Sequence, residues 1–221
     1  VAKMAPNGTW EWAISGGTSV VDDVGMSIAV NQQGVIYITG FHGGATFGNY
    51  NLGCNGTIDM FIAKVNNSGA WDWAVGPASS SGEDLGTAVA VDSAGNGYVT
   101  GTYPGTPTFG STTLNTNGYA SNNIFIAKIQ PNATWEWALQ HSSSIYPQYV
   151  LGIALDASNN SYITGNFIAH SPSSQGGLGP PLSGPTCFGS SHCLYTDSSG
   201  HEGSDIYVAK ANSTGSWVWA T

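Results

Sequence analysis

The sequence predicts an all-β fold: β-propeller-like repeats of four-stranded antiparallel blades, in a ring that this chain alone does not close. First, a segment ending in Trp-x-Trp-Ala occurs four times and contains all eight tryptophans. Second, a segment ending in Tyr-Ile/Val-Thr-Gly occurs three times. Third, no stretch carries the apolar spacing of an amphipathic helix, and Gly, Ser, Thr and Asn dominate the polar residues. That composition favours short strands and tight turns.

Each repeat supplies four short strands, best seen in the middle repeat. The expected strands are Thr87–Val91, Gly97–Gly101, Ile124–Lys128 and Trp135–Leu139. "SAGNG" and "QPNAT" provide the turn chemistry within the two hairpins. An excursion built on Phe-Gly and a following Leu joins the hairpins, which explains a repeat longer than the roughly 40–50 residues of common blades. A four-stranded antiparallel unit that recurs in this way is typical of a propeller blade.

We expect one repeat domain of about three and a half blades. It divides into an orphan hairpin at residues 1–13 and repeats at 14–74, 75–138 and 139–221. A Pro-, Gly- and Ser-rich insertion at 170–193 predicts a surface loop, either specialised for function or simply tolerated. Three and a half blades are too few for a ring, which needs at least about four. Either the sequence is part of a longer propeller chain, or another copy satisfies its open edges.

The middle repeat also resembles a known family. Its motif runs from Asp84-x-Gly86 through Ala88-Val-Ala-Val-Asp92 to Tyr98-Val-Thr-Gly101, then through Phe109-Gly110 to Phe125-Ile-Ala-Lys128 and the Trp pair. It is similar to the SBBP-type β-propeller repeat, which occurs in tandem in long secreted or surface-anchored prokaryotic proteins. The resemblance implies a propeller-like fold and an extracellular setting, and it implies no catalytic residues. The third repeat departs from the motif, with Tyr149-Val150 in place of an acidic pair.

The four lysines occupy one repeat position, seven residues before the first Trp of each pair. Gly8, Gly69 and Gly215 fit the left-handed position of a three-residue hairpin loop with a G1 bulge. This turn predicts that a lysine lies opposite an acidic residue in three hairpins: Lys3 with Glu11, Lys64 with Asp72 and Lys128 with Glu136. In the fourth hairpin the same turn predicts that Lys210 lies opposite Val218, which carries no charge.

The same register places both tryptophans of a pair on one face of the blade. Because propeller blades stack face to face, we expect these side chains to fill the space between neighbours. The alternative is a set of exposed aromatic platforms on which sugars stack.

Composition excludes several classes of partner. The 221 residues include four lysines and no arginine, with a formal net charge of −9, so neither nucleic acid nor an anionic membrane surface is an expected partner. No apolar run approaches the roughly 18–20 residues of a membrane span. The first residues lack the apolar region of a signal peptide, so any signal that the protein had has been removed or lies outside the sequence.

Six Asn-x-Ser/Thr sequons make the chain a candidate glycoprotein. They are Asn7, Asn55, Asn66, Asn132, Asn159 and Asn212. The alternative reading is that asparagine is a good turn residue.

The cysteines offer two readings. Cys187 and Cys193 flank a tight turn, and a disulfide between them fits an extracellular compartment. The rival is a metal site that adds His192 and His201. Cys54 is left over, either free or paired with another chain.

No cofactor is expected, with Ca²⁺ as the alternative at acidic positions. The candidates are Asp22 with Asp23, Glu83 with Asp84, and Asp92 with Asn96, none of which shows the alternating Asp ligand pattern. Capping of turns by Asx side chains is the simpler explanation of these residues. The five histidines lack a recurrent partner spacing, and neither a Gly-x-Ser-x-Gly elbow nor a convincing carboxylate pair occurs. We therefore expect no enzyme activity.

Two functions fit these observations. The first is a non-enzymatic extracellular structural protein that self-associates into a surface layer, appendage or fibre, with copies of itself joined by β-augmentation. Candidate interface residues are Val1, Lys3, Trp10, Trp12, Trp217 and Trp219. The alternative is a carbohydrate-binding module, lectin-like or adhesin-like, in which exposed aromatics and loops bind glycans.

Overall fold

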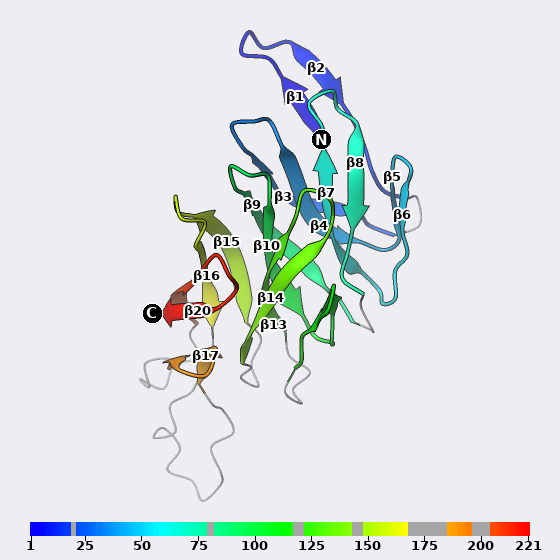
Figure 1. Cartoon of the computed structure of the whole chain (residues 1–221). Helices are drawn as coiled ribbons and strands as arrows, with labels where there is room; N and C mark the ends of the chain where they lie inside the picture. The colour runs from blue at the N-terminus through cyan, green and yellow to red at the C-terminus, as the bar shows by residue number, and fades with distance from the viewer. Residues whose placement is uncertain (19–20, 79–81, 117–121, 143–147, 168–184, 196–203) are drawn as a thin grey trace, which may run out of the picture.

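A computed structural model describes residues 1–18, 21–78, 82–116, 122–142, 148–167, 185–195 and 204–221. Within these ranges every regular element is a β-strand, so the predicted all-β fold is confirmed (Figure 1). A search of the described residues for a helix long and apolar enough to cross a bilayer finds none.

The strands form three blades with the same antiparallel order. Blade 1 consists of β3 (Val24–Val30), β4 (Ile36–His42), β7 (Asp59–Val65) and β8 (Trp71–Val75). Blade 2 consists of β9 (Leu85–Val91), β10 (Gly97–Tyr103), β13 (Asn123–Ile129) and β14 (Trp135–Ser142). Blade 3 consists of β15 (Tyr149–Leu155), β16 (Ser161–Phe167), β19 (Asp205–Ala211) and β20 (Trp217–Ala220). Each strand predicted for the middle repeat lies inside an observed one.

The first hairpin stands apart as a half blade, residues 1–13. Its strands β1 (Ala2–Met4) and β2 (Trp10–Ala13) pair only with each other among the described residues. They correspond to the two outer strands of a full blade. The half blade and blade 3 lie at opposite ends of the array, so the described strands form an open fan (Figure 1).

The Phe-Gly excursions are small hairpins, which the sequence did not predict as strands. They are β5 (Ala45–Phe47) with β6 (Tyr50–Leu52), β11 (Thr108–Phe109) with β12 (Thr112–Thr113), and β17 (Thr186–Phe188) with β18 (His192–Leu194). Each is also hydrogen-bonded to the chain leaving the preceding blade. Phe188 pairs with His141, Thr108 pairs with Ala78, and the amide of Gly17 donates to the carbonyl of Thr46. The excursions therefore fasten neighbouring blades together.

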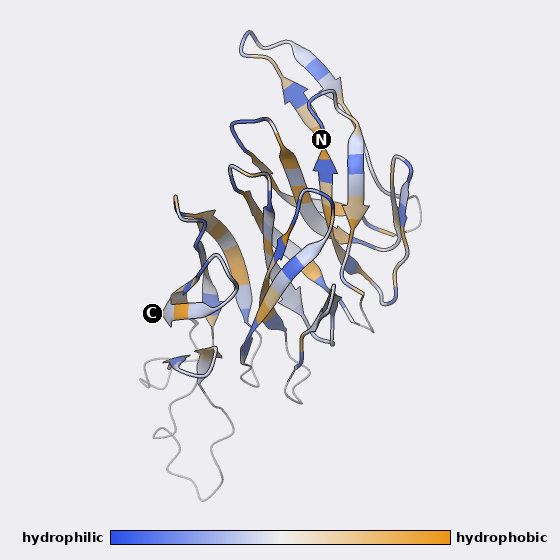
Figure 2. Ribbon diagram, viewed as in Figure 1, coloured by the Kyte–Doolittle hydropathy of each residue, from blue (hydrophilic) through white to orange (hydrophobic). Residues whose placement is uncertain are grey.

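The hydrophobic core is divided among three clusters, one between each pair of neighbours. In Figure 2 the hydrophobic residues lie mostly on the strands, which also carry hydrophilic positions, as on β1, β8 and β14. The inner strands cross closely: a Cβ at Gly86 would lie 2.1 Å from Oγ1 of Thr39 in the preceding blade. A side chain at Gly86, on the first strand of blade 2, would therefore collide with blade 1.

The insertion at 170–193 lies outside the described residues up to position 184. Its last part forms β17 and β18, so this segment returns to the repeat pattern.

Candidate functional site

The Lys–Trp hairpins have the predicted turn. Gly8, Gly69 and Gly215 adopt φ values of 85°, 80° and 80°, and Ala133 takes the same left-handed conformation at 68°. In blade 1 the amide of Gly69 donates to the carbonyl of Asn66. A three-residue loop with a left-handed third residue is therefore confirmed.

The residue that faces each lysine differs from the prediction. Lys3, Lys64 and Lys128 lie directly opposite Trp12, Trp73 and Trp137. The acidic residue is the extra residue of a β-bulge in the Trp strand, which the sequence did not predict. The ion pairs still form, with Nζ–O distances of 2.7 Å for Lys3–Glu11, 3.3 Å for Lys64–Asp72 and 3.1 Å for Lys128–Glu136.

Lys210 finds another partner. It lies 3.5 Å from Asp156 in the inner hairpin of blade 3 and 4.8 Å from the ring centre of Tyr162. Hydrogen bonding by Asn160 is the main reason why the pKa of Asp156 lies below its usual value. Contact with Tyr162, followed by the charge of Asp156, raises the pKa of Lys210. Asp156 therefore neutralises this lysine in place of the carboxylate that is missing at position 218.

The bulge also corrects the prediction that both tryptophans of a pair share one face. We call Trp10, Trp71, Trp135 and Trp217 the leading tryptophans and Trp12, Trp73, Trp137 and Trp219 the trailing tryptophans. Trp71 packs in the cluster between the half blade and blade 1, whereas Trp73 packs in the cluster between blades 1 and 2. The extra residue interrupts the alternation of side chains, so the two rings point in opposite directions.

As a result, each joint between neighbours contains one trailing and one leading tryptophan. The first joint holds Trp12 and Trp71, the second Trp73 and Trp135, and the third Trp137 and Trp217. These six rings pack against the inter-blade clusters: Trp73 is buried, and the other five are partly buried.

The trailing tryptophan docks on the outer turn of the next blade. Its Nε1–H donates to a carbonyl there: Trp12 to Asn67 at 3.1 Å, Trp73 to Pro131 at 2.9 Å and Trp137 to Ser213 at 3.3 Å. The three acceptors hold the same repeat position, three residues after the lysine.

The ring lies over the left-handed residue of that turn. A Cβ on Gly69 would lie 2.6 Å from the ring of Trp12, and one on Gly215 would lie 2.7 Å from Trp137. Glycine in these two turns therefore permits both the backbone conformation and the close approach of the indole.

The leading tryptophan points back to the preceding blade. Trp71 donates to the carbonyl of Ser15 at 3.2 Å, and Trp217 donates to that of Gln140 at 2.9 Å. The leading rings of the three full blades also meet the Phe of their own excursion edge-on: Trp71 and Phe47 have ring centres 5.0 Å apart. The first and third joints thus combine hydrogen bonds in both directions with aromatic packing.

Two faces of the array have no neighbour among the described residues. The leading face belongs to the half blade and blade 1. There Trp10 is 64% exposed. Met4 is 49% exposed and Ile28 58% exposed, although their respective equivalents, Val65 and Val89, are buried in the first and second joints. An open hollow of about 540 Å³ lies on this side, lined by β1 and β3.

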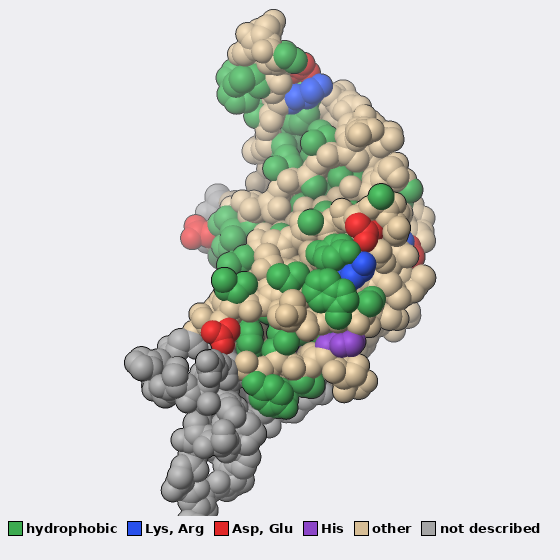
Figure 3. Space-filling model, turned by 90° about the vertical axis from the view of Figure 1, so that its left-hand side faces the viewer, with side chains coloured by type: hydrophobic (Ala, Val, Ile, Leu, Met, Phe, Trp, Pro, Cys, Tyr) green, Lys and Arg blue, Asp and Glu red, His purple; other side chains and the backbone are tan. Residues whose placement is uncertain are grey.

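The trailing face belongs to blade 3. Ile206 is 79% exposed there, whereas its counterpart in blade 1, Met60, is fully buried. Trp219 packs edge-on against Tyr162 with ring centres 6.0 Å apart, as Trp73 packs on Tyr37. Figure 3 looks onto this side of the molecule and shows hydrophobic side chains gathered at the surface.

The four tryptophans among the predicted interface residues therefore divide into two groups. Trp12 and Trp217 are occupied in internal joints, while Trp10 and Trp219 lie on the uncovered faces. Lys3 is paired with Glu11, and the Val1 amino group donates to the carbonyl of Ile14.

The six sequons all lie in described turns or loops. Asn7, Asn55 and Asn132 are exposed, whereas Asn66, Asn159 and Asn212 are half-buried. Asn66 and Asn212 each accept several hydrogen bonds within their turn. The first three are therefore the more accessible glycosylation candidates.

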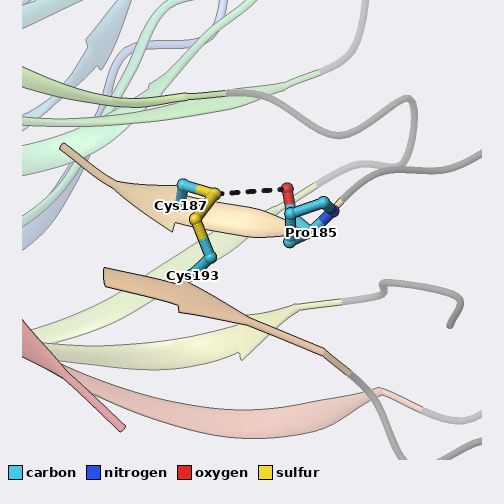
Figure 4. The surroundings of a disulfide bond; sticks show 3 residues. All are labelled: Pro185, Cys187 and Cys193. Atoms are coloured by element: carbon cyan, nitrogen blue, oxygen red, sulfur yellow. Dashed lines mark hydrogen bonds between the residues drawn. A yellow bond between two sulfur atoms is a disulfide. The ribbon is translucent and has the colours of Figure 1, made fainter. Parts of the chain in front are cut away.

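The predicted disulfide is present. Cys187 and Cys193 face each other on β17 and β18 with their sulfurs bonded (Figure 4). The rival metal reading used His201, which lies outside the described residues. Cys54 is a half-buried thiol, and burial is the main reason why its pKa is raised.

The three acidic pairs do not gather at one place. Asp92 accepts hydrogen bonds from the backbone amide and the side-chain nitrogen of Asn96 in its own hairpin turn, which is turn capping. Asp23 accepts hydrogen bonds from the amides of Thr18 and Gly43, which is turn capping. Asp22 is exposed, whereas Asp84 is buried beside β7, where its amide donates to Ile58. Glu83 accepts a weak hydrogen bond from Thr57. Within the described ranges no three His, Cys, Asp or Glu side chains form a group suited to a metal ion.

Two buried histidines serve as hydrogen-bond acceptors. Nδ1 of His42 accepts from the amide of Gly44, and Nδ1 of His141 accepts from that of Ile124, each at 3.0 Å. Burial lowers the pKa of both, to about 4 for His141. His192 is half-buried on β18, and His170 and His201 lie outside the described residues.

Comparisons with known proteins supply no name. No protein-family model matches the chain, and no curated protein matches it. Among solved structures it is similar to a protein of unknown function from Bacteroides caccae, with 12% sequence identity and a TM-score of 0.26, over 89% of this chain and 80% of that one. The resemblance to the SBBP-type repeat stays a prediction from sequence.

Proposed function

We propose that this protein is a non-enzymatic structural component that self-associates into a layer, appendage or fibre. The observation that carries the proposal is the pair of uncovered faces on an open array. Both faces present hydrophobic side chains at positions that are buried wherever a neighbouring blade is present. Exposed patches of this kind mark interaction surfaces in soluble proteins.

The unpaired edge of β1 gives self-association a second route. In the three blades the strand equivalent to β1 pairs on both sides, with β4, β10 or β16 on its inner side. Among the described residues β1 pairs only with β2. An unpaired strand of this kind accepts a strand from another chain.

An extracellular location is part of the proposal. A disulfide supports it, because disulfides persist in oxidising compartments. The exposed sequons and the resemblance to a repeat of secreted proteins agree with this setting. A carbohydrate-binding role has less support, because six of the eight tryptophans are packed inside joints.

The test is the assembly state of the intact chain. In analytical ultracentrifugation the mass of the sedimenting species should increase as the concentration rises. Negative-stain microscopy should show continuous polymers or sheets. A chain that remains monomeric across the accessible concentration range would contradict the proposal. A glycan array on the same material then tests the carbohydrate alternative.

A further inference from the structure

We infer that two copies of this chain join head to tail, with Trp219 of one copy docked on the Gly8 turn of the next. The resulting joint repeats the three joints inside the chain. This inference rests on the proposed self-association and names its contact.

Among the described residues, the contacts between trailing indoles and outer turns leave one indole and one turn without a counterpart. Three trailing indoles dock on three outer turns, as described above. Trp219 has its Tyr162 neighbour, but no turn of the described residues accepts its Nε1–H. The half blade has the converse arrangement, a turn without an indole.

The turn of the half blade has the shape that the internal turns use. Gly8 has the same left-handed conformation as Gly69 and Gly215. Where those two glycines lie against an indole, a Cβ on Gly8 would meet nothing within 4 Å. The carbonyl of Pro6 occupies the position of the three acceptors, three residues after Lys3.

The surrounding side chains extend the match. On the trailing side Ile206 is 79% exposed, while its counterparts Met60 and Ile124 are fully buried in the second and third joints. On the leading side Met4 is 49% exposed, while its counterpart Val65 is fully buried. Trp10 is the leading tryptophan that a fourth joint requires opposite Trp219.

A second copy fits these faces electrostatically as well. Lys3 and Lys210, in the hairpins that carry the two tryptophans, are each paired with a carboxylate of their own chain. Apolar contacts can therefore form without leaving a buried unpaired charge. Because donor and acceptor lie on opposite faces, the contact is heterologous, and it extends as an open filament when the rotation from copy to copy does not close a ring.

A complementation experiment tests the joint. A trailing-blocked variant carries Trp219→Ala and Ile206→Glu, and a leading-blocked variant carries Met4→Glu and Trp10→Ala. Each variant alone should sediment as a monomer, because one half of every contact is removed. An equimolar mixture should form one-to-one heterodimers and nothing longer, because one intact trailing face then meets one intact leading face.

Val218→Glu is the matched control. It introduces the same charge one residue from Trp219, at the bulge position that carries Glu11, Asp72 and Glu136 in the other hairpins. Polymers should form as in the unmodified chain. Circular dichroism and thermal melting should show that all variants fold.

The outcomes separate this inference from the proposed function. If the unmodified chain polymerises but the blocked variants also polymerise, or fail to pair when mixed, the Trp219–Gly8 joint is wrong although self-association stands. Ala2→Pro then tests the edge of β1, with Ala2→Val as its control. Val1 and Ile14 exchange backbone hydrogen bonds across the hairpin, so the N–H of the next residue, Ala2, points to the open edge. A monomeric unmodified chain overturns both proposals.

Discussion

The second joint and the trailing face of blade 3 present the same kinds of side chain in opposite states. In the joint, Trp73 is 8% exposed and Met60 is fully buried. On blade 3 the corresponding Trp219 keeps its aromatic neighbour, and the corresponding Ile206 faces solvent. The repeat thus fixes the direction of each side chain, whereas the neighbouring blade decides whether it is buried. A single blade therefore supplies only one of the two faces that form a hydrophobic core.

The first joint lies between these extremes. The half blade contributes Trp12 and Ile14 to the packing but has no inner strands. Trp12 keeps its hydrogen bond to Asn67 but lacks the Tyr neighbour that Trp73 and Trp137 have on β4 and β10. The docking of an indole on a turn therefore forms even when only the outer half of a blade is present. In a joint between two copies the roles would be reversed, with the half blade supplying the turn and the complete blade 3 supplying the indole.

The largest expected contrast comes from truncating equivalent tryptophans. Trp73→Ala should lower the free energy of unfolding by about 3–5 kcal/mol, because it opens a cavity in a packed core. Trp219→Ala should cost about 1 kcal/mol or less, because this ring contacts its own blade on one side only. Both substitutions should be made in the leading-blocked background, so that assembly does not contribute, and measured by denaturant unfolding. Equal losses would show that the trailing face is as well packed as the joint.

The sequence predicted the blades because their repeats, alternation and turn residues agree with one another. It did not predict the β-bulge in the Trp strand, because the Trp-x-Trp spacing looks like regular alternation unless the partner strand is known. That single extra residue reverses one ring of each pair, and it is why the joints could not be derived from the motif. The Lys210–Asp156 pair was also missed, because it links residues far apart in the sequence. The uncovered faces follow from packing between blades, which no local pattern records.

Acid should weaken the third joint through His141. The pKa of this buried imidazole is about 4, below the ordinary value of 6.5, because burial disfavours its charged form. Between these values the unfolded chain binds the proton more readily, so stability should fall as pH drops from about 6.5 towards 4. The shift corresponds to roughly 3 kcal/mol at the acid end. Denaturant unfolding at several pH values measures this loss.

His141→Gln is the control for that titration. It should lower stability at neutral pH but flatten the decline in acid, so the slope is the informative quantity. An unchanged slope would assign the acid sensitivity to other groups, such as His42, whose pKa is also lowered.

The smallest expected effect separates an ion pair inside the array from one at its end. Lys128 has a side chain 11% exposed, pairs with Glu136 and lies 5.5 Å from the ring centre of Tyr98. Lys3 has a side chain 42% exposed and pairs only with Glu11, because the half blade has no inner strand to supply a tyrosine. Lys128→Met should therefore lower the free energy of unfolding by about 1 kcal/mol, and Lys3→Met by less than about 0.5 kcal/mol.

Added salt should remove most of the Lys3 effect and little of the Lys128 effect, since solvent ions screen an exposed pair more strongly. Equal costs at low and high salt would mean that the neighbouring inner strands add nothing to the lysine, and that the half blade is electrostatically equivalent to a complete one.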